Sequence, residues 1–105
     1  MAMIDISVVP VGTASASVSQ YVAGALKILQ REPGIKYQLT PMNTVIEGDL
    51  DRLLAVAQQM HLSAFAAGAA RVVTTLRIDD RRDKPLTMAG KVAAVEKKIG
   101  QIRRD

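Results

Sequence analysis

Cysteine and tryptophan are absent from the 105-residue chain, and aromatic side chains, histidine and long apolar runs are scarce. The absence of cysteine excludes disulfide bonds, cysteine-ligated zinc and thiol catalysis. No segment approaches the roughly 20 consecutive apolar residues that a membrane-spanning helix needs. The first residues contain no basic region and meet Asp5 at once, so we do not expect a signal peptide. We therefore expect a single cytoplasmic domain without a membrane partner.

The scarcity of aromatic side chains and of histidine limits the function further. The formal charge is +4, but the three aromatic residues are too few to form stacking platforms for bases, so we expect no nucleic-acid partner. The single histidine, His61, has no second histidine or cysteine beside it, which argues against histidine catalysis. Asp79 and Asp80 could hold a hard cation, but no third ligand is evident, so we expect no metal and no cofactor.

The first half of the chain predicts a strand, a helix and a hairpin. Apolar and polar residues alternate from residue 3 to residue 9, which predicts a strand that Pro10 ends. Helical spacing begins near Ser17, where Ser17 and Gln20 have the spacing of a capping box, and Pro33–Gly34 ends this helix. Segments 35–40 and 44–47 favour two short strands around a tight turn.

The second half predicts a helix, a strand and a final helix. Asp49 is the expected N-cap of the second helix, and Gly68 follows its end. Segment 69–78 is rich in β-branched residues and predicts the longest strand, which a charged loop over 79–84 follows. The last helix begins near Thr87, and its apolar face consists of Val92, Val95, Ile99 and Ile102.

This order of elements predicts an α+β fold, the ferredoxin-like βαββαβ arrangement with an additional C-terminal helix. Two helices cover one face of a four-stranded antiparallel sheet. The other face should be apolar, so we expect the last helix to cover part of it and a second subunit to cover the rest. The chain is therefore predicted to form a homo-oligomer.

The same topology predicts where a site would form. Segments 10–13, 40–44 and 68–71 should meet at one edge of the sheet, although they lie far apart in the sequence. The first helix begins at this edge, so its free N–H groups and Ser17 would face the same region. We expect the three loops to surround one binding pocket.

Three segments carry a resemblance to a known family: residues 10–22 (PVGTASASVSQYV), 37–48 (YQLTPMNTVIEG) and 68–83 (GAARVVTTLRIDDRRD). Together they resemble the small thiamine-binding protein family over nearly the whole chain. The resemblance implies single ferredoxin-like domains that assemble as dimers and tetramers. It also implies non-catalytic binding of thiamine, or of its hydroxymethylpyrimidine part, at or near a subunit interface. The family commonly has glycine where this chain has Asn43, which adds an amide at the turn.

A thiamine site needs apolar walls, a few convergent polar groups and some negative charge. Thr40, Asn43 and Thr44 offer hydrogen-bond donors and acceptors, and Met42 offers a polarisable wall for a flat ring. Glu47 is a candidate partner for the amino group or the cation. The full set of candidate ligand-binding residues is Ser7, Ser17, Thr40, Met42, Asn43, Thr44, Glu47 and Arg71.

Each candidate also has a purely structural interpretation. Thr44 fits a strand, Ser17 fits a helix cap, and Glu47 fits a solvated strand end. Met42 fits ordinary packing, and Arg71 could bind an anion or form an ion pair. Two other functions stay open: an enzyme that uses Arg71 and a carboxylate, and an interaction protein whose sheet serves assembly alone.

Overall fold

The computed structural model describes residues 1–13 and 17–103, with side chains as far as Gly100. It contains four strands and three helices within that part of the chain. In chain order they are β1 Ala2–Val11, α1 Ser19–Gln30, β2 Lys36–Leu39, β3 Thr44–Gly48, α2 Leu50–Ala66, β4 Arg71–Asp80 and α3 Met88–Arg103.

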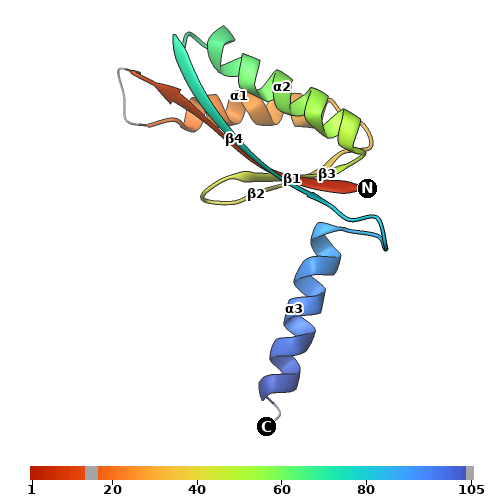
Figure 1. Cartoon of the computed structure of the whole chain (residues 1–105). Coiled ribbons are helices and arrows are strands. Elements are labelled where there is room, and N and C mark those ends of the chain that lie inside the picture. Colours follow the sequence, from red (N-terminus) through yellow and green to blue (C-terminus); the bar gives the residue numbers. More distant parts are fainter. Residues whose placement is uncertain (14–16, 104–105) are drawn as a thin grey trace.

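The sheet has the strand order β2-β3-β1-β4, and all neighbouring strands are antiparallel. Helices α1 and α2 lie together over one face, and α3 lies on the other side of the sheet (Figure 1). The predicted ferredoxin-like α+β fold with an additional C-terminal helix is confirmed.

Strand alternation places the core between the sheet and the first two helices. Ile4 and Ile6 of β1 and Ile46 of β3 point to the helix face, where each is at most 2% exposed. Leu29 of α1 and Leu53 of α2 close this core from above. Burying one such side chain fully stabilises the fold by about 1.5–3 kcal/mol.

The bounds of β1 and β4, which form the longest strand pair, differ from those predicted from the sequence. β1 continues through Pro10 to Val11, and β4 begins at Arg71 and includes Asp79 and Asp80. Proline is tolerated because β3 begins opposite Ile6, so the side of β1 that lies beyond Ile6 has no partner strand to receive an N–H. The prediction that Pro10 ends the strand was therefore wrong.

The predicted capping box at Ser17 was also wrong. α1 begins at Ser19, its N-cap position is Val18, and no side chain caps it. The Ser17 and Ser19 hydroxyl groups instead share a hydrogen bond of 3.3 Å. Asp49 does occupy the N-cap position of α2, as predicted, but its side chain makes no capping bond.

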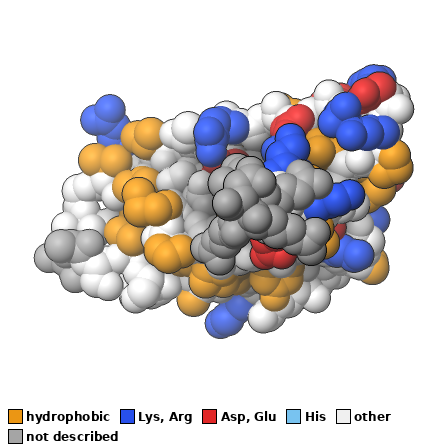
Figure 2. Space-filling view, turned by 90° about the horizontal axis from the view of Figure 1, so that it is seen from below, with side chains coloured by type: hydrophobic (Ala, Val, Ile, Leu, Met, Phe, Trp, Pro, Cys, Tyr) orange, Lys and Arg blue, Asp and Glu red, His pale blue; other side chains and the backbone are white. Residues whose placement is uncertain are grey.

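The second face of the sheet is less apolar than the sequence suggested. Residues at the centre of this face include Asp5 and Arg77, which form an ion pair. Figure 2, which views the molecule from the side of α3, shows Lys and Arg side chains interspersed with hydrophobic ones. Only the end of this face near Glu47 meets α3, where the Met88 N–H donates to Glu47 Oε2 at 2.7 Å.

Beyond its first turn, α3 projects away from the sheet (Figure 1). Its apolar residues Val92, Val95 and Ile99 are 53%, 56% and 42% exposed. The radius of gyration of the Cα atoms is therefore 16.0 Å, larger than the roughly 13 Å of a compact chain of this length. The expected cover of part of the second face by this helix is therefore confined to the end near Glu47.

Candidate functional site

A hollow of about 450 Å³ lies between the first half of α1, the second half of β1 and the turn from β2 to β3. We call it the hairpin hollow. Its walls are mostly apolar, and no charged side chain or histidine is among the described residues that line it. The apolar walls include Ile6, Val8, Leu26, Leu39 and Met60. This size and lining are typical of sites for small organic molecules.

The turn that closes one side of the hairpin hollow is held by its own hydrogen bonds. The Thr40 hydroxyl donates to Asn43 Oδ1 at 2.6 Å, and the Thr40 N–H donates to the Asn43 carbonyl at 2.9 Å. The Asn43 N–H in turn donates to the Thr40 hydroxyl oxygen at 3.1 Å. These bonds confirm the predicted tight turn and give it one defined shape.

Asp5 connects this turn to the sheet. One oxygen of its carboxylate accepts a hydrogen bond from Asn43 Nδ2, and the other accepts from Arg77 Nε at 2.8 Å. The Asn43 amide is therefore fixed at both ends, since its oxygen accepts from Thr40 and its nitrogen donates to Asp5. One N–H and one lone pair of the amide are left for a ligand.

Five of the eight candidate residues line the hairpin hollow. Thr44 is 6% exposed and lines this hollow. Thr40, Asn43 and Ser7 also line the hollow, although alternation along β1 points the Ser7 side chain to the same face as Asp5. Met42 is 85% exposed at the tip of the turn.

The other three candidates lie elsewhere. Ser17 lines a separate hollow together with Gly68 and the two alanines that follow it. Arg71 lies at the exposed start of β4, opposite Val11. Glu47 lies in a groove beside α3, together with Lys36, Met88 and Val92.

Of the three loops expected to meet, segments 10–13 and 68–71 do meet, around the hollow that Ser17 lines. The hairpin turn lies apart from them, and the register shows why. β3 begins opposite Ile6, whereas β4 begins opposite Val11. Five residues of an extended strand span about 16 Å, which separates the hairpin turn from the start of β4. The hairpin turn, β1 and α1 surround the hairpin hollow, and Met60 of α2 also lines it.

Glu47 is 4% exposed, and its carboxylate accepts from the first N–H of α3. Negative charge at a helix N-terminus is favourable, because the free N–H groups give that end a partial positive charge. In this position Glu47 fixes the start of α3. The register also shows that Asp5 and Glu47 point to the same face of the sheet, because Asp5 pairs with Val45 and Met3 pairs with Glu47.

Sequence reasoning missed some of the residues that form the hairpin hollow. Tyr21, Leu26 and Leu39 line it, but their spacing predicted only a buried stripe and a strand. Tyr21 is 9% exposed, and it is the one aromatic side chain among the described lining residues. A hollow beside a helix leaves no signal in the helix periodicity, because lining residues and core residues lie on the same face.

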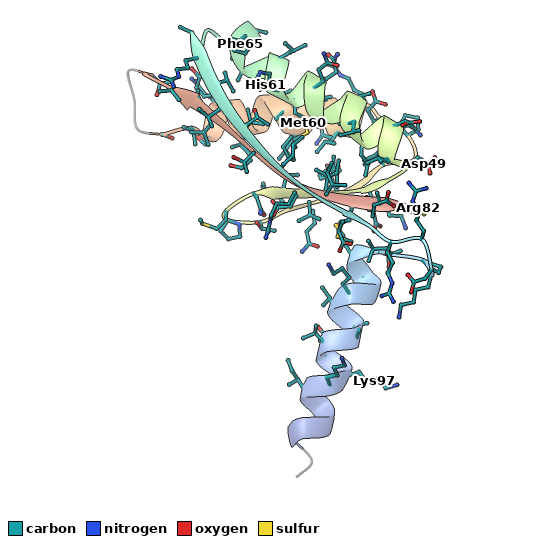
Figure 3. All side chains as sticks on the ribbon, viewed as in Figure 1. Asp49, Met60, His61, Phe65, Arg82 and Lys97 are labelled. Carbon is teal, nitrogen blue, oxygen red and sulfur yellow. The ribbon has the colours of Figure 1, made fainter. Side chains whose placement is uncertain are left out.

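His61 takes no part in the hairpin hollow. It lies on α2 with Phe65, as Figure 3 shows, and its Nδ1 lies 2.6 Å from the Thr74 hydroxyl on β4. The His61 and Phe65 rings meet edge to face at 5.4 Å.

In the loop after β4, the hydrogen bond from the Arg81 guanidinium lowers the pKa of the Asp83 carboxyl.

The described residues contain no group of three or more His, Cys, Asp and Glu side chains that could hold a metal ion. None of the helices in the described ranges is both long and apolar enough to span a bilayer.

Relatives match this chain over most of its length. It is 52% identical over 102 residues to the UPF0045 protein YqgV of Bacillus subtilis, covering 94% of this chain and 98% of that protein. It is 53% identical over 100 residues to a UPF0045 protein of Staphylococcus xylosus, covering 92% of this chain and 94% of that protein.

Solved structures share the fold. The hypothetical protein MJ1052 of Methanocaldococcus jannaschii matches with a TM-score of 0.81 at 36% identity, covering 90% of this chain and 95% of that one. A Thermotoga maritima protein, provisionally assigned to thiamine biosynthesis or salvage, matches with a TM-score of 0.72 at 23% identity, covering 90% of this chain and 97% of that one. The family model described as "Thiamine-binding protein" matches residues 4–96, which include the whole hairpin hollow. The chain therefore belongs to the thiamine-binding protein family.

Proposed function

We propose that this protein binds thiamine, or its hydroxymethylpyrimidine part, in the hairpin hollow and does not transform it chemically. The family to which the chain belongs supports a thiamine-related ligand. The hollow has the size and the apolar walls that suit a small flat ring. Its polar groups come from one side, the turn from Thr40 to Thr44.

The single observation that carries the proposal is the absence of charge among the described lining residues of this hollow, combined with the buried Thr44 in its wall. A neutral aminopyrimidine can enter such a site and hydrogen-bond to Thr44 and Asn43. The thiazolium cation would lose its hydration there without gaining a carboxylate partner, so it remains at the opening. The pyrimidine half is thus the part that the hollow recognises.

The lining also supports a role without catalysis. Acyl, phosphoryl or proton transfer by side chains needs a nucleophile beside a general base, and the described lining residues include no histidine, carboxylate or lysine. Arg71, the residue on which an enzymatic alternative depended, lies outside the hollow.

Substitution of Thr44 by valine tests the site. Valine keeps the shape of threonine but removes the hydroxyl, so a buried hydrogen bond to the pyrimidine is lost. We expect the Kd for thiamine and for hydroxymethylpyrimidine to rise about tenfold, measured by isothermal titration calorimetry.

The matched control is Thr75→Val, which removes a hydroxyl from an exposed position on β4, away from the hollow. We expect it to leave the Kd unchanged. Equal affinities of Thr44→Val and the unchanged protein would contradict the assignment of the hairpin hollow as the site.

We further propose that the protein works as a homo-oligomer, a dimer or a tetramer. The exposed stripe of Val92, Val95 and Ile99 supports this, because apolar side chains on a projecting helix need a surface to cover them. The cytoplasmic location and the absence of a nucleic-acid partner stay predictions from the sequence.

A further inference from the structure

Asn43 carries a side-chain amide whose orientation is fixed from two directions. Its Nδ2 donates to one oxygen of the Asp5 carboxylate, and its Oδ1 accepts from the Thr40 hydroxyl at 2.6 Å. Arg77 donates from Nε to the other oxygen of Asp5 at 2.8 Å. Asp5 is thus held between a guanidinium and an amide, and both of its oxygens act as acceptors.

A reversed Asn43 amide does not fit this network. If the amide were turned by half a rotation, Oδ1 would face the Asp5 carboxylate, and two acceptors would oppose each other without a proton between them. The Thr40 hydroxyl does not choose between the two orientations by itself, because a hydroxyl both donates and accepts. Asp5 therefore decides which end of the amide points in which direction.

The same amide belongs to the wall of the hairpin hollow. Asn43 lies half-buried on the turn from β2 to β3, and the hollow extends from this turn to Ser7 and Val8, beyond the start of β3 opposite Ile6. After its two internal bonds, the amide still offers one donor at Nδ2 and one acceptor at Oδ1. Both atoms belong to one planar group, so a donor and an acceptor lie side by side at a fixed spacing.

Hydroxymethylpyrimidine carries the complementary pair of groups. Its 4-amino group donates, and the ring nitrogen next to that group accepts. A carboxamide reads an equivalent pair on adenine through two parallel hydrogen bonds. The substituent at position 5, which carries the thiazolium ring in thiamine, lies on the far side of the amino group and leaves this edge free.

We propose that Asn43 selects a 4-aminopyrimidine, and that Asp5 and Thr40 are positioning residues that keep its amide in the selecting orientation. The inference rests on the proposed function, because it names the edge of the pyrimidine that the hairpin hollow recognises. A 4-oxopyrimidine presents the opposite pair, a ring N–H donor beside a carbonyl acceptor. Against the fixed amide, donor meets donor and acceptor meets acceptor, so the oxo compound is rejected.

Two ligands that differ only at position 4 test this selection. They are hydroxymethylpyrimidine and its deaminated 4-oxo form, and isothermal titration calorimetry gives the Kd of each. For the unchanged protein, we expect the Kd of the oxo form to be at least about tenfold higher, as for other paired contacts between an amide and a base. Equal Kd values would overturn the selection, and binding of neither ligand would overturn the proposed function as well.

Asn43→Ala removes the selecting amide. Alanine fits the turn, because no non-glycine residue in the described part of the chain has a positive φ. We expect the Kd of hydroxymethylpyrimidine to rise about tenfold and the Kd of the oxo form to change little, so the ratio of the two falls to about one. A ratio as large as that of the unchanged protein would contradict the role of Asn43.

Gln38→Ala is the matched control. It removes a carboxamide from β2 of the same hairpin, but this carboxamide lies in the groove beside α3. We expect the ratio of the two Kd values to stay as in the unchanged protein. If Thr44→Val weakens binding while Asn43→Ala keeps the full ratio, the proposed function stands and the selection by Asn43 is wrong.

Asp5→Asn tests the positioning role. The new amide can offer its oxygen to Arg77 and its N–H to Asn43, which turns the Asn43 amide round. We therefore expect the preference to shift towards the oxo form, so that its Kd becomes equal to or lower than that of hydroxymethylpyrimidine. A purely structural role of Asp5 would weaken both ligands alike, and an unchanged ratio in this variant would overturn the positioning role.

Discussion

At the scale of single residues, Asp5 has an unexpected position in the protein. Its carboxylate accepts from Asn43 on the hairpin turn and from Arg77 on β4, and its side chain is 21% exposed. The turn that carries the polar groups of the hairpin hollow is thereby tied to the middle of the sheet. The polar part of the proposed site depends on a residue that does not line it.

Substitution of Asp5 by alanine should show this dependence. The Asn43 amide loses an acceptor in a half-buried position, so we expect the free energy of unfolding to fall by about 1–3 kcal/mol in urea denaturation. We also expect weaker binding of thiamine, because the turn loses its support.

Arg77→Ala is the control for this prediction. It removes the other partner of Asp5, but the Arg77 side chain is 81% exposed, so its ion pair should contribute at most about 1 kcal/mol. A loss of stability in Asp5→Ala no larger than in Arg77→Ala would show that the bond to Asn43 does not matter.

At the scale of the elements, the sequence predicted the order and type of every strand and helix but not the ends of β1 and β4. Proline was interpreted as the end of the strand, and this shortened β1 by two residues. The overhang of β1 beyond β3 separates the hairpin turn from the other two loops, which do meet. The lengths and the register of two paired strands decide which loops lie together. The apolar–polar pattern of one strand does not show its register with its neighbour.

The position of Glu47 has the same kind of explanation. Its place on the third strand was predicted correctly, but the start of α3 comes from a segment 41 residues away along the chain. The pattern of β3 alone contains no sign that a helix N-terminus would meet this carboxylate. The turn from Thr40 to Thr44, by contrast, depends on local contacts and was predictable from its own residues.

Glu47→Gln separates the two roles considered for this residue. Glutamine keeps an acceptor oxygen but removes the charge at the start of α3, which should cost about 0.3–1 kcal/mol. We expect faster hydrogen exchange of the Met88 amide and an unchanged Kd for thiamine. A tenfold higher Kd for thiamine would show that Glu47 belongs to the binding site.

At the scale of the whole molecule, the projecting α3 is the feature that a single chain does not explain. Helices hold their place in globular proteins mainly by packing an apolar face, yet the apolar face of α3 is exposed over Val92, Val95 and Ile99. The sequence pattern predicted the helix and its apolar face correctly. It did not predict the direction in which the helix points. That direction depends on the surface against which the apolar face packs, and the sequence of the helix does not identify this surface.

Val95→Glu tests whether α3 contributes to assembly. A carboxylate in the middle of the apolar stripe would have to be buried in any contact that this stripe makes, so we expect a smaller oligomer in sedimentation velocity. The hairpin hollow lies on the other side of the sheet, so we expect an unchanged Kd for hydroxymethylpyrimidine. An unaltered sedimentation coefficient would exclude α3 from the interface.

The most direct test of the central claim is to map the ligand onto the backbone amides by nuclear magnetic resonance. With hydroxymethylpyrimidine added, we predict that the largest shift changes fall at residues 39–44 and 19–26, which surround the hairpin hollow. Residues 88–96, beside Glu47, should change little. Changes centred on residues 88–96, or no changes with either hydroxymethylpyrimidine or thiamine, would contradict the proposal that this hollow binds the pyrimidine.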